Sequence, residues 1–170
     1  AEALATGGGA AVLFLDLDDF KNVNDDMGHD AGDALLTGVG HRIVATVRPG
    51  DLACRLGGDE FSILLPETDR LEDAEGVATR LLEAIAAPVE IEGVTVRVPA
   101  SVGVAMRQPG EPIGVDDLVR RADVAMYHAK ARGKDRLTVY VPELEDPARG
   151  APARAVVRRT PRARSSWAAP

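Results

Sequence analysis

The sequence predicts one α+β domain in which helices pack on a largely antiparallel sheet of about five strands. Segments with strand-like and helix-like spacing of apolar residues alternate along the chain, which indicates mixed structure. Two short glycine-containing links each join a pair of apolar runs, and such links are typical of hairpins with antiparallel strands. At 170 residues, with 45% hydrophobic and 28% charged, the chain has the size and composition of one globular domain.

The cysteine content and the lengths of the apolar stretches indicate the cellular compartment. Cys54 is the single cysteine in the sequence, which excludes an internal disulfide and suits a reducing cytoplasm. Its place in a strand-like run predicts a small buried side chain. No apolar stretch is long enough to span a bilayer and no signal peptide opens the sequence, so we expect a cytoplasmic protein without a membrane partner.

The distribution of charge argues against nucleic acid as a partner. The net charge is −7 at pH 7. All acidic residues precede residue 147, and the segment beyond carries arginines without acids. The main part of the chain is therefore strongly acidic, whereas phosphate backbones require a basic face.

The first third of the chain predicts a buried strand and two helical segments. Residues 1–9 are expected to be the end of a preceding helix that runs into a glycine-rich loop. The continuous apolar run over residues 10–15 predicts a strand covered on both faces. Residues 18–21 are expected to turn into a short helical segment. Helical spacing of apolar residues predicts a helix over residues 29–47, which Pro49-Gly50 ends.

A hairpin is predicted over residues 51–65, with Gly57-Gly58 as its two-residue turn and Pro66 closing the second strand. Glycine accepts the positive φ that such turns demand. Asp59 and Glu60 follow the turn directly, so two carboxylates are expected at the tip of the hairpin. This pair alone is equally typical of a solvated turn.

The remaining elements follow from the same spacing rules. Residues 71–85 predict a helix that stops near Pro88, and residues 115–131 predict a third long helix capped by Gly133. Between them, residues 89–91 and 94–106 predict a second hairpin around Glu92-Gly93, with Pro99 marking a bulge or an edge. A short strand is expected over residues 137–141. Residues 143–170, rich in Ala, Arg and Pro, are expected to be a disordered tail.

The first predicted strand ends in acids that require an explanation. Asp16 follows the apolar run, and a carboxylate at the end of a buried strand is costly unless it is paired or bound to a metal. If this strand lies beside the hairpin, Asp16 and Asp59 could share a hard divalent cation, bound through oxygen as Mg²⁺ prefers.

Three segments resemble, in order, the successive signatures of GGDEF domains, the diguanylate cyclase family. They are Asp16-Leu-Asp-Asp-Phe-Lys-Asn-Val-Asn24, Gly28-His-Asp-Ala-Gly-Asp33 and Gly57-Gly-Asp-Glu-Phe61. The resemblance implies a palm-like, ferredoxin-like β-α-β-β-α-β core over residues 10–142, related to nucleotidyl cyclases and polymerase palms. It also implies condensation of two GTP molecules into cyclic di-GMP with release of pyrophosphate, with Mg²⁺ or Mn²⁺. An EAL phosphodiesterase domain often follows in such proteins.

The resemblance also implies roles at the metal and the phosphates. Asp16, Asp59 and the Leu17 carbonyl would be metal ligands, and Glu60 would be a second metal ligand or the general base. The other phosphate contacts would come from the backbone around Asp19, Phe20, Gly57 and Gly58 and from the ammonium groups of Lys21, Lys130 and Lys134. For Lys130 and Lys134 the alternative is a cation placed favourably at a helix C-terminus.

Guanine and product would be recognised by two further sets of residues. Asn24 and Asp33 match the family's guanine readers, since Asp33 can accept from the N1–H and the exocyclic amine. The alternative for Asp33 is an acid in the first turn of a helix. Arg48 and Asp51 resemble the family's product-inhibition site, with Arg80 as an assisting residue, because Arg can fork onto guanine O6 and N7. The alternative there is a loop ion pair.

The resemblance predicts a homodimer at the moment of catalysis, because a two-fold symmetric product fits two domains that each hold one GTP. Two non-catalytic functions remain open from the sequence: a GTP-binding regulator, and a cyclic di-GMP receptor that uses Arg48 and Asp51. A template-dependent polymerase is disfavoured because no basic surface is predicted.

Overall fold

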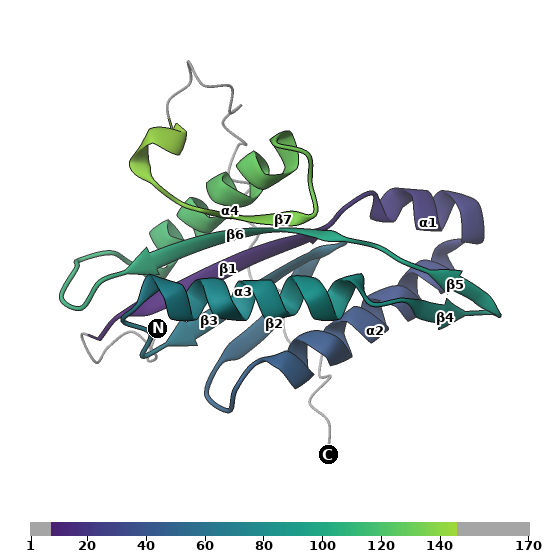
Figure 1. The fold of residues 1–170 in the computed structure, drawn as a ribbon, viewed down its shortest axis with the longest axis horizontal. Coiled ribbons are helices and arrows are strands. Elements are labelled where there is room, and N and C mark those ends of the chain that lie inside the picture. Colours follow the sequence, from purple (N-terminus) through teal and green to yellow (C-terminus); the bar gives the residue numbers. More distant parts are fainter. Residues whose placement is uncertain (1–7, 146–170) are drawn as a thin grey trace.

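The computed structural model of the protein describes residues 8–145 (Figure 1). The elements, in chain order, are β1 (Ala10–Leu17), α1 (Phe20–Met27), α2 (His29–Thr46), β2 (Leu52–Gly57), β3 (Glu60–Pro66), α3 (Leu71–Ala86), β4 (Val89–Ile91), β5 (Val94–Val96), β6 (Ala100–Arg107), α4 (Val115–Ala131), β7 (Arg136–Val139) and the 3-10 helix η2 (Pro142–Glu145). No helix among residues 8–145 is both long enough and apolar enough to cross a membrane.

Strand β1 lies at the centre of a five-stranded sheet with the order β2-β3-β1-β6-β7. It pairs antiparallel with β3 on one side and with β6 on the other, and β2 pairs antiparallel with β3. Strands β6 and β7 pair in parallel. The predicted α+β class and the mostly antiparallel sheet of five strands are therefore confirmed.

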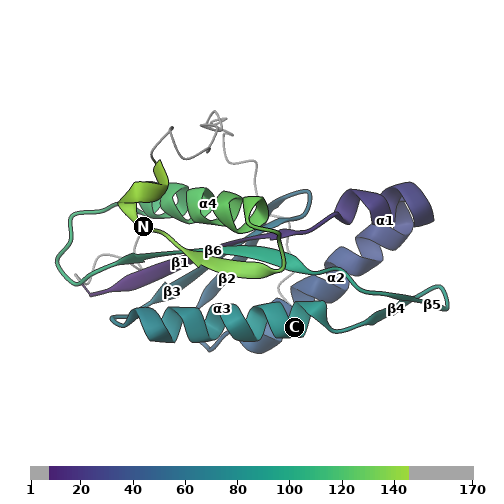
Figure 2. The same ribbon diagram turned by 45° about the horizontal axis from the view of Figure 1, so that its top comes forward.

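Helices cover both faces of the central strands, as Figure 2 shows with α4 on one side of the sheet and α3 on the other. Successive residues of β1 point to opposite faces. Leu13 and Leu15 pack in the larger core with α2 and α3, whereas Val12 and Phe14 pack against α4. All eight residues of β1 are buried. This explains why the strand reads as a continuous apolar run rather than an alternating one.

The first hairpin turns one residue later than predicted. Gly57 belongs to β2 and pairs with Glu60, and the register shifts between Arg55 and Gly57. The turn is therefore Gly58-Asp59, and Gly58 has a φ of 58°. The first residue of a tight hairpin turn can require this left-handed conformation, which glycine adopts without strain. The shift brings Asp59 into the turn itself.

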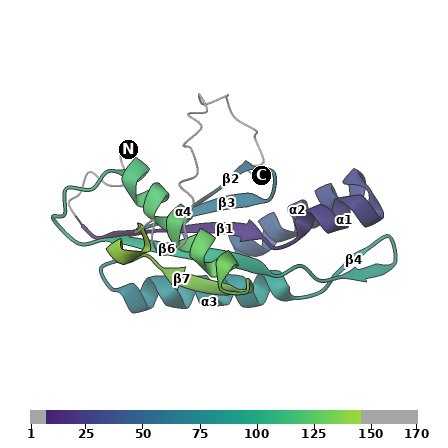
Figure 3. The same ribbon diagram turned by 90° about the horizontal axis from the view of Figure 1, so that it is seen from above.

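The second hairpin is shorter than predicted. Glu92 and Gly93 form its turn, with φ values of 51° and 79°. The predicted return strand over residues 94–106 is interrupted, because β5 ends at Val96 and β6 begins at Ala100. Pro99 lies in this break, where a residue without an N–H costs no ladder hydrogen bond. Hairpin β4–β5 extends beyond the main sheet, as seen in Figure 3.

Two further predictions about segment ends are corrected. The short helical segment expected over residues 18–21 is α1, which begins later and is two turns long. The predicted tail begins too early, because η2 is ordered and its Leu144 is buried. The carbonyl of Leu144 lies 3.0 Å from Nε2 of His128 in α4, which fixes η2 to that helix. Residues 1–7 and 146–170, including the rest of the predicted tail, lie outside the described residues.

The prediction that Cys54 is buried is wrong, because its side chain is exposed. Cys54 lies on the edge strand β2, opposite Ser62 in the register. Leu52 and Leu56 point to the same face and are also exposed. Helix α4 packs on β1, β6 and β7 and does not extend over β2. An edge strand that no described helix covers on this face leaves its small apolar side chains in solvent.

We predict that Gly103→Ala strongly destabilises the domain. Gly103 lies on β6 directly under α4, and an added Cβ would overlap the carbonyl of Ala122 and the amide of Met126. Because both atoms are helix backbone, α4 would have to move as a unit, at a cost of about 3 kcal/mol or more. Chemical denaturation measures this change.

The matched control is Gly40→Ala. Gly40 lies within α2, and a Cβ there meets no atom within 4 Å. Alanine should therefore stabilise the helix by about 0.5–1 kcal/mol. Equal effects of the two substitutions would contradict the packing of α4 on β6.

Candidate active site

Acidic side chains from two neighbouring strands meet at the end of β1. Asp16 lies opposite Glu60 in the antiparallel register of β1 and β3. The N–H of Leu17 donates to the carbonyl of Asp59 at 3.3 Å, which joins the end of β1 to the hairpin turn. The predicted adjacency of the first strand and the acidic hairpin is therefore confirmed, and it brings Asp16, Asp59 and Glu60 together.

Helix α4 supplies a cation to this acidic group. Lys130 lies in the last turn of α4, and its Nζ is 2.6 Å from Oδ1 of Asp16. The side chain of Asp16 is 7% exposed and that of Lys130 is 32% exposed. The contact is a short ion pair to a buried carboxylate oxygen. The ammonium group of Lys130 is thus the cation that this buried oxygen meets.

The environment of Asp16 disfavours its charged form. The pKa of this carboxyl is raised from 3.8 to about 6, chiefly by burial and also by the negative charges of Asp59 and Glu60. Lys130 acts in the opposite direction and does not fully offset the burial. Close carboxylates in partly buried surroundings are the arrangement that a bound divalent cation relieves.

The donors at this position fit a hard cation better than a soft one. Carboxylate and carbonyl oxygens are the ligands of Mg²⁺ and Mn²⁺. Among residues 8–145 no three His, Cys, Asp or Glu side chains are close enough to hold an ion by themselves. Asp16 and the hairpin acids would therefore need other oxygens, such as a backbone carbonyl or phosphate, to complete the coordination of a metal.

The turn after β1 faces the turn after α4. Asp19 has a φ of 58° and precedes α1, where its carboxylate accepts from Nζ of Lys134 at 2.6 Å. The phenyl ring of Phe20 is buried in the core, so only its backbone is available at the start of α1. Lys21 is exposed on α1, and Lys130 rather than Lys21 is the lysine that contacts Asp16.

The candidate guanine readers lie next to each other on α1 and α2. Asn24 is half-buried on α1, and its Oδ1 lies so close to Gly32 that a Cβ there would overlap it. Gly32 therefore allows the amide of Asn24 to pack against α2. Asp33 is the next residue and is exposed in the second turn of α2. The structure thus brings the side chain of Asn24 against the residue that precedes Asp33.

The candidate product site lies at the opposite end of strand β2. Nε of Arg48 donates to Asp51 Oδ1 at 3.1 Å, and the Arg48 N–H donates to Oδ2 at 3.0 Å. The guanidinium also donates to the carbonyl of Pro66 at 2.7 Å and to Thr68 Oγ1 at 3.3 Å. The alternative of a loop ion pair is therefore present in this structure. Arg80 is exposed on α3, and none of the contacts described for Arg48 involves it.

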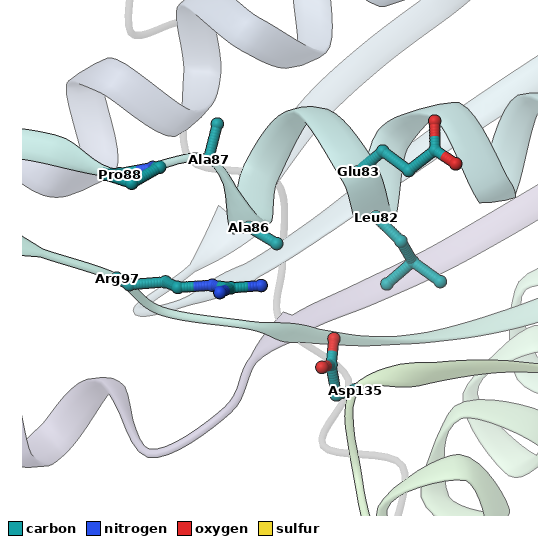
Figure 4. Close-up of a pocket in the computed structure, with 7 residues that line it drawn as sticks. All are labelled: Leu82, Glu83, Ala86, Ala87, Pro88, Arg97 and Asp135. Atoms are coloured by element: carbon teal, nitrogen blue, oxygen red, sulfur yellow. The ribbon is translucent and has the colours of Figure 1, made fainter.

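A separate hollow of about 440 Å³ lies between the end of α3 and the turn before β7 (Figure 4). It is lined by Leu82, Glu83, Ala86, Ala87, Pro88, Arg97 and Asp135. None of the predicted site residues lines it. The predicted site residues therefore lie outside this hollow.

Sequence reasoning missed one acid at the site. Asp18 is buried, and its two carboxylate oxygens accept hydrogen bonds from Ser101 and from the backbone of Asp135. The spacing Asp16-Leu17-Asp18 does not indicate which of the two acids accepts hydrogen bonds from other segments and which one pairs with a lysine. Only the partners from β6 and from the turn before β7 distinguish them.

The chain matches known proteins over most of its length. The family described as diguanylate cyclase, GGDEF domain, matches residues 2–136. The bifunctional diguanylate cyclase/cyclic di-GMP phosphodiesterase MucR of Pseudomonas aeruginosa is 48% identical over 125 residues, which are 74% of this chain and 18% of that protein. Diguanylate cyclase TpbB of the same species is 41% identical over 140 residues, or 81% of this chain and 31% of that protein.

Solved structures match as well. An EAL/GGDEF domain protein from M. capsulatus has a TM-score of 0.74 and 38% identity, covering 83% of this chain and 93% of that chain. The GGDEF domain of DgcB from Caulobacter crescentus, in complex with c-di-GMP, has a TM-score of 0.74 and 27% identity, covering 81% of each chain.

The chain therefore belongs to the GGDEF domain family, the family of diguanylate cyclases. The palm-like fold expected from the motifs is confirmed by these structures. The chain spans less than a third of the full length of MucR and of TpbB.

We predict that Asp16→Asn stabilises the metal-free domain above about pH 6. Wild-type stability should fall as pH rises from about 4 to about 6, because the folded state holds the proton of Asp16 more tightly than the unfolded state does. The raised pKa corresponds to roughly 3 kcal/mol, which asparagine should recover at neutral pH and not below pH 4.

Urea denaturation in a chelator at several pH values measures this difference. Asp26→Asn, an equal change of charge at an exposed position of α1, is the control and should leave the pH dependence unchanged. A parallel pH dependence in wild type and Asp16→Asn would show that Asp16 is not the group that titrates.

Proposed function

We propose that this domain is a metal-dependent diguanylate cyclase. The 3′-hydroxyl of each of two GTP molecules attacks the α-phosphorus of the other. Two new phosphodiester bonds form, each α–β phosphoanhydride bond breaks, and two pyrophosphates leave. Cyclic di-GMP is the product, as expected from the relatives that are named diguanylate cyclases.

One observation carries this proposal: the buried carboxylate of Asp16 lies beside Asp59 and Glu60, and its Oδ1 already meets a cation, the ammonium group of Lys130. Asp16, Asp59, Glu60 and the Leu17 carbonyl would hold Mg²⁺ or Mn²⁺. When bound, such an ion neutralises phosphate oxygens and lowers the pKa of an attacking hydroxyl. Glu60 would either complete this coordination or accept the hydroxyl proton.

The lysines near Asp16 are suited to the triphosphate. Lys130 and Lys134 are held beside Asp16 and Asp19 by ion pairs of 2.6 Å each. An arriving polyphosphate offers these ammonium groups more negative charge than the single carboxylates do. Backbone N–H groups at the start of α1 and around Gly57 and Gly58 can contribute further, since helix starts and glycine turns favour anions. Lys21 on α1 would assist from the exposed side.

Asn24 and Asp33 would select guanine. A carboxylate accepts hydrogen bonds from N1–H and the exocyclic amine of guanine, whereas adenine offers no donor at N1. A site whose carboxylate is left unpaired rejects the wrong base by several kcal/mol.

Catalysis requires two copies of the domain, because each half-site holds one GTP and the two reactions are equivalent by symmetry. Feedback by the product would act at Arg48 and Asp51, with Arg80 as a further contact. For Arg48 to fork onto guanine, its guanidinium must exchange the contacts to Pro66 and Thr68 for the base.

We predict that Asp59→Asn and Glu60→Gln each reduce cyclic di-GMP formation from GTP and Mg²⁺ by about 100-fold or more, since each removes a charge on which transition-state stabilisation depends. Chromatography of the products measures the rate. Glu83→Gln, a matched change on the exposed face of α3, is the control. Activity within tenfold of wild type in either variant would remove that residue from the catalytic machinery.

The same assay tests whether two copies are needed. The rate per chain should rise with protein concentration until the dimer is fully formed, at saturating GTP. A rate per chain that is independent of concentration in a monomeric protein would contradict the scheme. A wild-type protein that binds GTP by calorimetry without forming product would favour the regulatory alternative.

We predict that Arg48→Ala weakens inhibition by cyclic di-GMP at least tenfold, because it removes the cation that would read the guanine edge. It also removes the hydrogen bonds to Pro66 and Thr68, so a loss of about 1 kcal/mol of stability is expected. Arg70→Ala is the control, because Arg70 is exposed and its 3.6 Å ion pair with Glu72 is solvated. Unchanged inhibition in Arg48→Ala would exclude this site.

A further inference from the structure

Asp18 joins three segments that are far apart in the sequence. Its carboxylate accepts from Oγ of Ser101 on β6 at 2.8 Å and from the backbone N–H of Asp135 at 3.0 Å. Its own N–H donates to the carbonyl of Pro99 at 2.9 Å. The residue is 2% exposed. The end of β1, the start of β6 and the turn before β7 therefore meet at one buried side chain.

The turn that Asp18 holds is in an unfavourable backbone conformation. Gly133, Lys134 and Asp135 have consecutive φ values of 113°, 62° and 48°. Residues with a Cβ adopt such values only where the surrounding structure holds them. The hydrogen bond from Asp135 to Asp18 and the bond from the Lys134 N–H to the Ala129 carbonyl, at 3.1 Å, hold this turn. Losing the first of them would free the part of the turn that faces β1.

This turn carries Lys134, one of the lysines of the proposed phosphate site. Lys134 reaches Asp19, the neighbour of Asp18, across the gap between the two turns. Asp18 is therefore the chain neighbour of Asp19, and its hydrogen bond to Asp135 fixes the distance between the turn that carries Asp19 and the turn that carries Lys134. The guanine readers Asn24 and Asp33 lie on α1 and α2 and make no hydrogen bond to Asp18 in the described structure.

Asp18 is not suited to touch the nucleotide itself. Its negative charge would repel phosphate oxygens. Both of its oxygens already accept hydrogen bonds, whereas Oδ1 of Asp16 meets the ammonium group of Lys130. Burying a carboxylate costs free energy unless its hydrogen bonds are satisfied, and here they are satisfied by groups of the protein.

We infer that Asp18 is a positioning residue for the triphosphate half of the site, which fixes the Lys134 turn and the β1–α1 turn relative to each other. This inference rests on the proposed function, because it presumes that GTP phosphates bind between these turns. Of the two acids in the Asp-Leu-Asp segment, Asp16 would then face the ligand, and Asp18 would hold the ligand-binding segments together.

The test compares a probe that has the triphosphate with one that lacks it. The probes are a GTP analogue with a methylene group between its α and β phosphorus atoms, which cannot react, and guanosine. Calorimetry with Mg²⁺ gives the Kd of each for the full chain. Asp18→Ala should weaken the analogue about tenfold, since a lost hydrogen bond frees the turn, and should change guanosine less than twofold.

Two further variants complete the test. Asp18→Asn should bind the analogue within threefold of wild type, because its amide can accept from Asp135 and donate to Ser101. Ser101→Ala removes the tie to β6 alone and should weaken the analogue about threefold, with guanosine unchanged. Asp26→Asn is the matched control for charge and should bind both probes as wild type does.

Three results would overturn the inference. They are unchanged binding of the analogue by Asp18→Ala, equal weakening of both probes, and an Asp18→Asn variant as weak as Asp18→Ala. If Asp18→Ala does not fold, Ser101→Ala decides, and unchanged analogue binding by that variant contradicts the inference. A wild-type protein that binds the analogue no better than guanosine would refute the proposed function instead, because no phosphate site would then exist.

Discussion

The pairing of β1 with the acidic hairpin is the constraint from which the rest of the site follows. β1 is covered on both faces, so its end delivers Asp16 into a nearly dry environment. The antiparallel register with β3 then fixes Glu60 opposite Asp16 and Asp59 beside Leu17. Burial raises the pKa of Asp16, the charges of Asp59 and Glu60 act in the same direction, and a cation opposes both effects. Lys130 provides one positive charge in the structure, and a divalent ion between phosphates and carboxylates would provide more.

Asp16 and Asp18 are only two residues apart, and their environments differ because they meet different sets of donor groups. Asp16 meets one ammonium group, that of Lys130, at 2.6 Å from its Oδ1. Asp18 meets a hydroxyl and a backbone N–H, and both of its oxygens are used. Burial alone does not distinguish them, because both are nearly inaccessible to solvent. The partners come from β6 and from the turn before β7, which are more than 80 residues away in the chain.

The hairpin that carries the acids also separates the two candidate sites. Asp59 lies at its turn, whereas Arg48 and Asp51 lie at the start of β2, about 20 Å away for a strand of this length. Thr68 links Arg48 to the start of β1. Its hydroxyl accepts from the Arg48 guanidinium, and its N–H donates to the carbonyl of Gly9 at 3.2 Å. The region around Arg48 is therefore tied to the point where the chain enters the sheet.

Periodicity and turn chemistry in the sequence determined the α+β class, the central apolar strand, the long helices and the hairpins, because these depend on residues close together in the chain. The motifs also indicated which acids, lysines and arginines belong to one family's site. Tertiary structure alone decided the exposure of Cys54, the break in the strand at Pro99, the formation of the 3-10 helix η2 and the different surroundings of Asp16 and Asp18. Each of these depends on which distant element covers or donates to the residue, and local spacing does not carry that information.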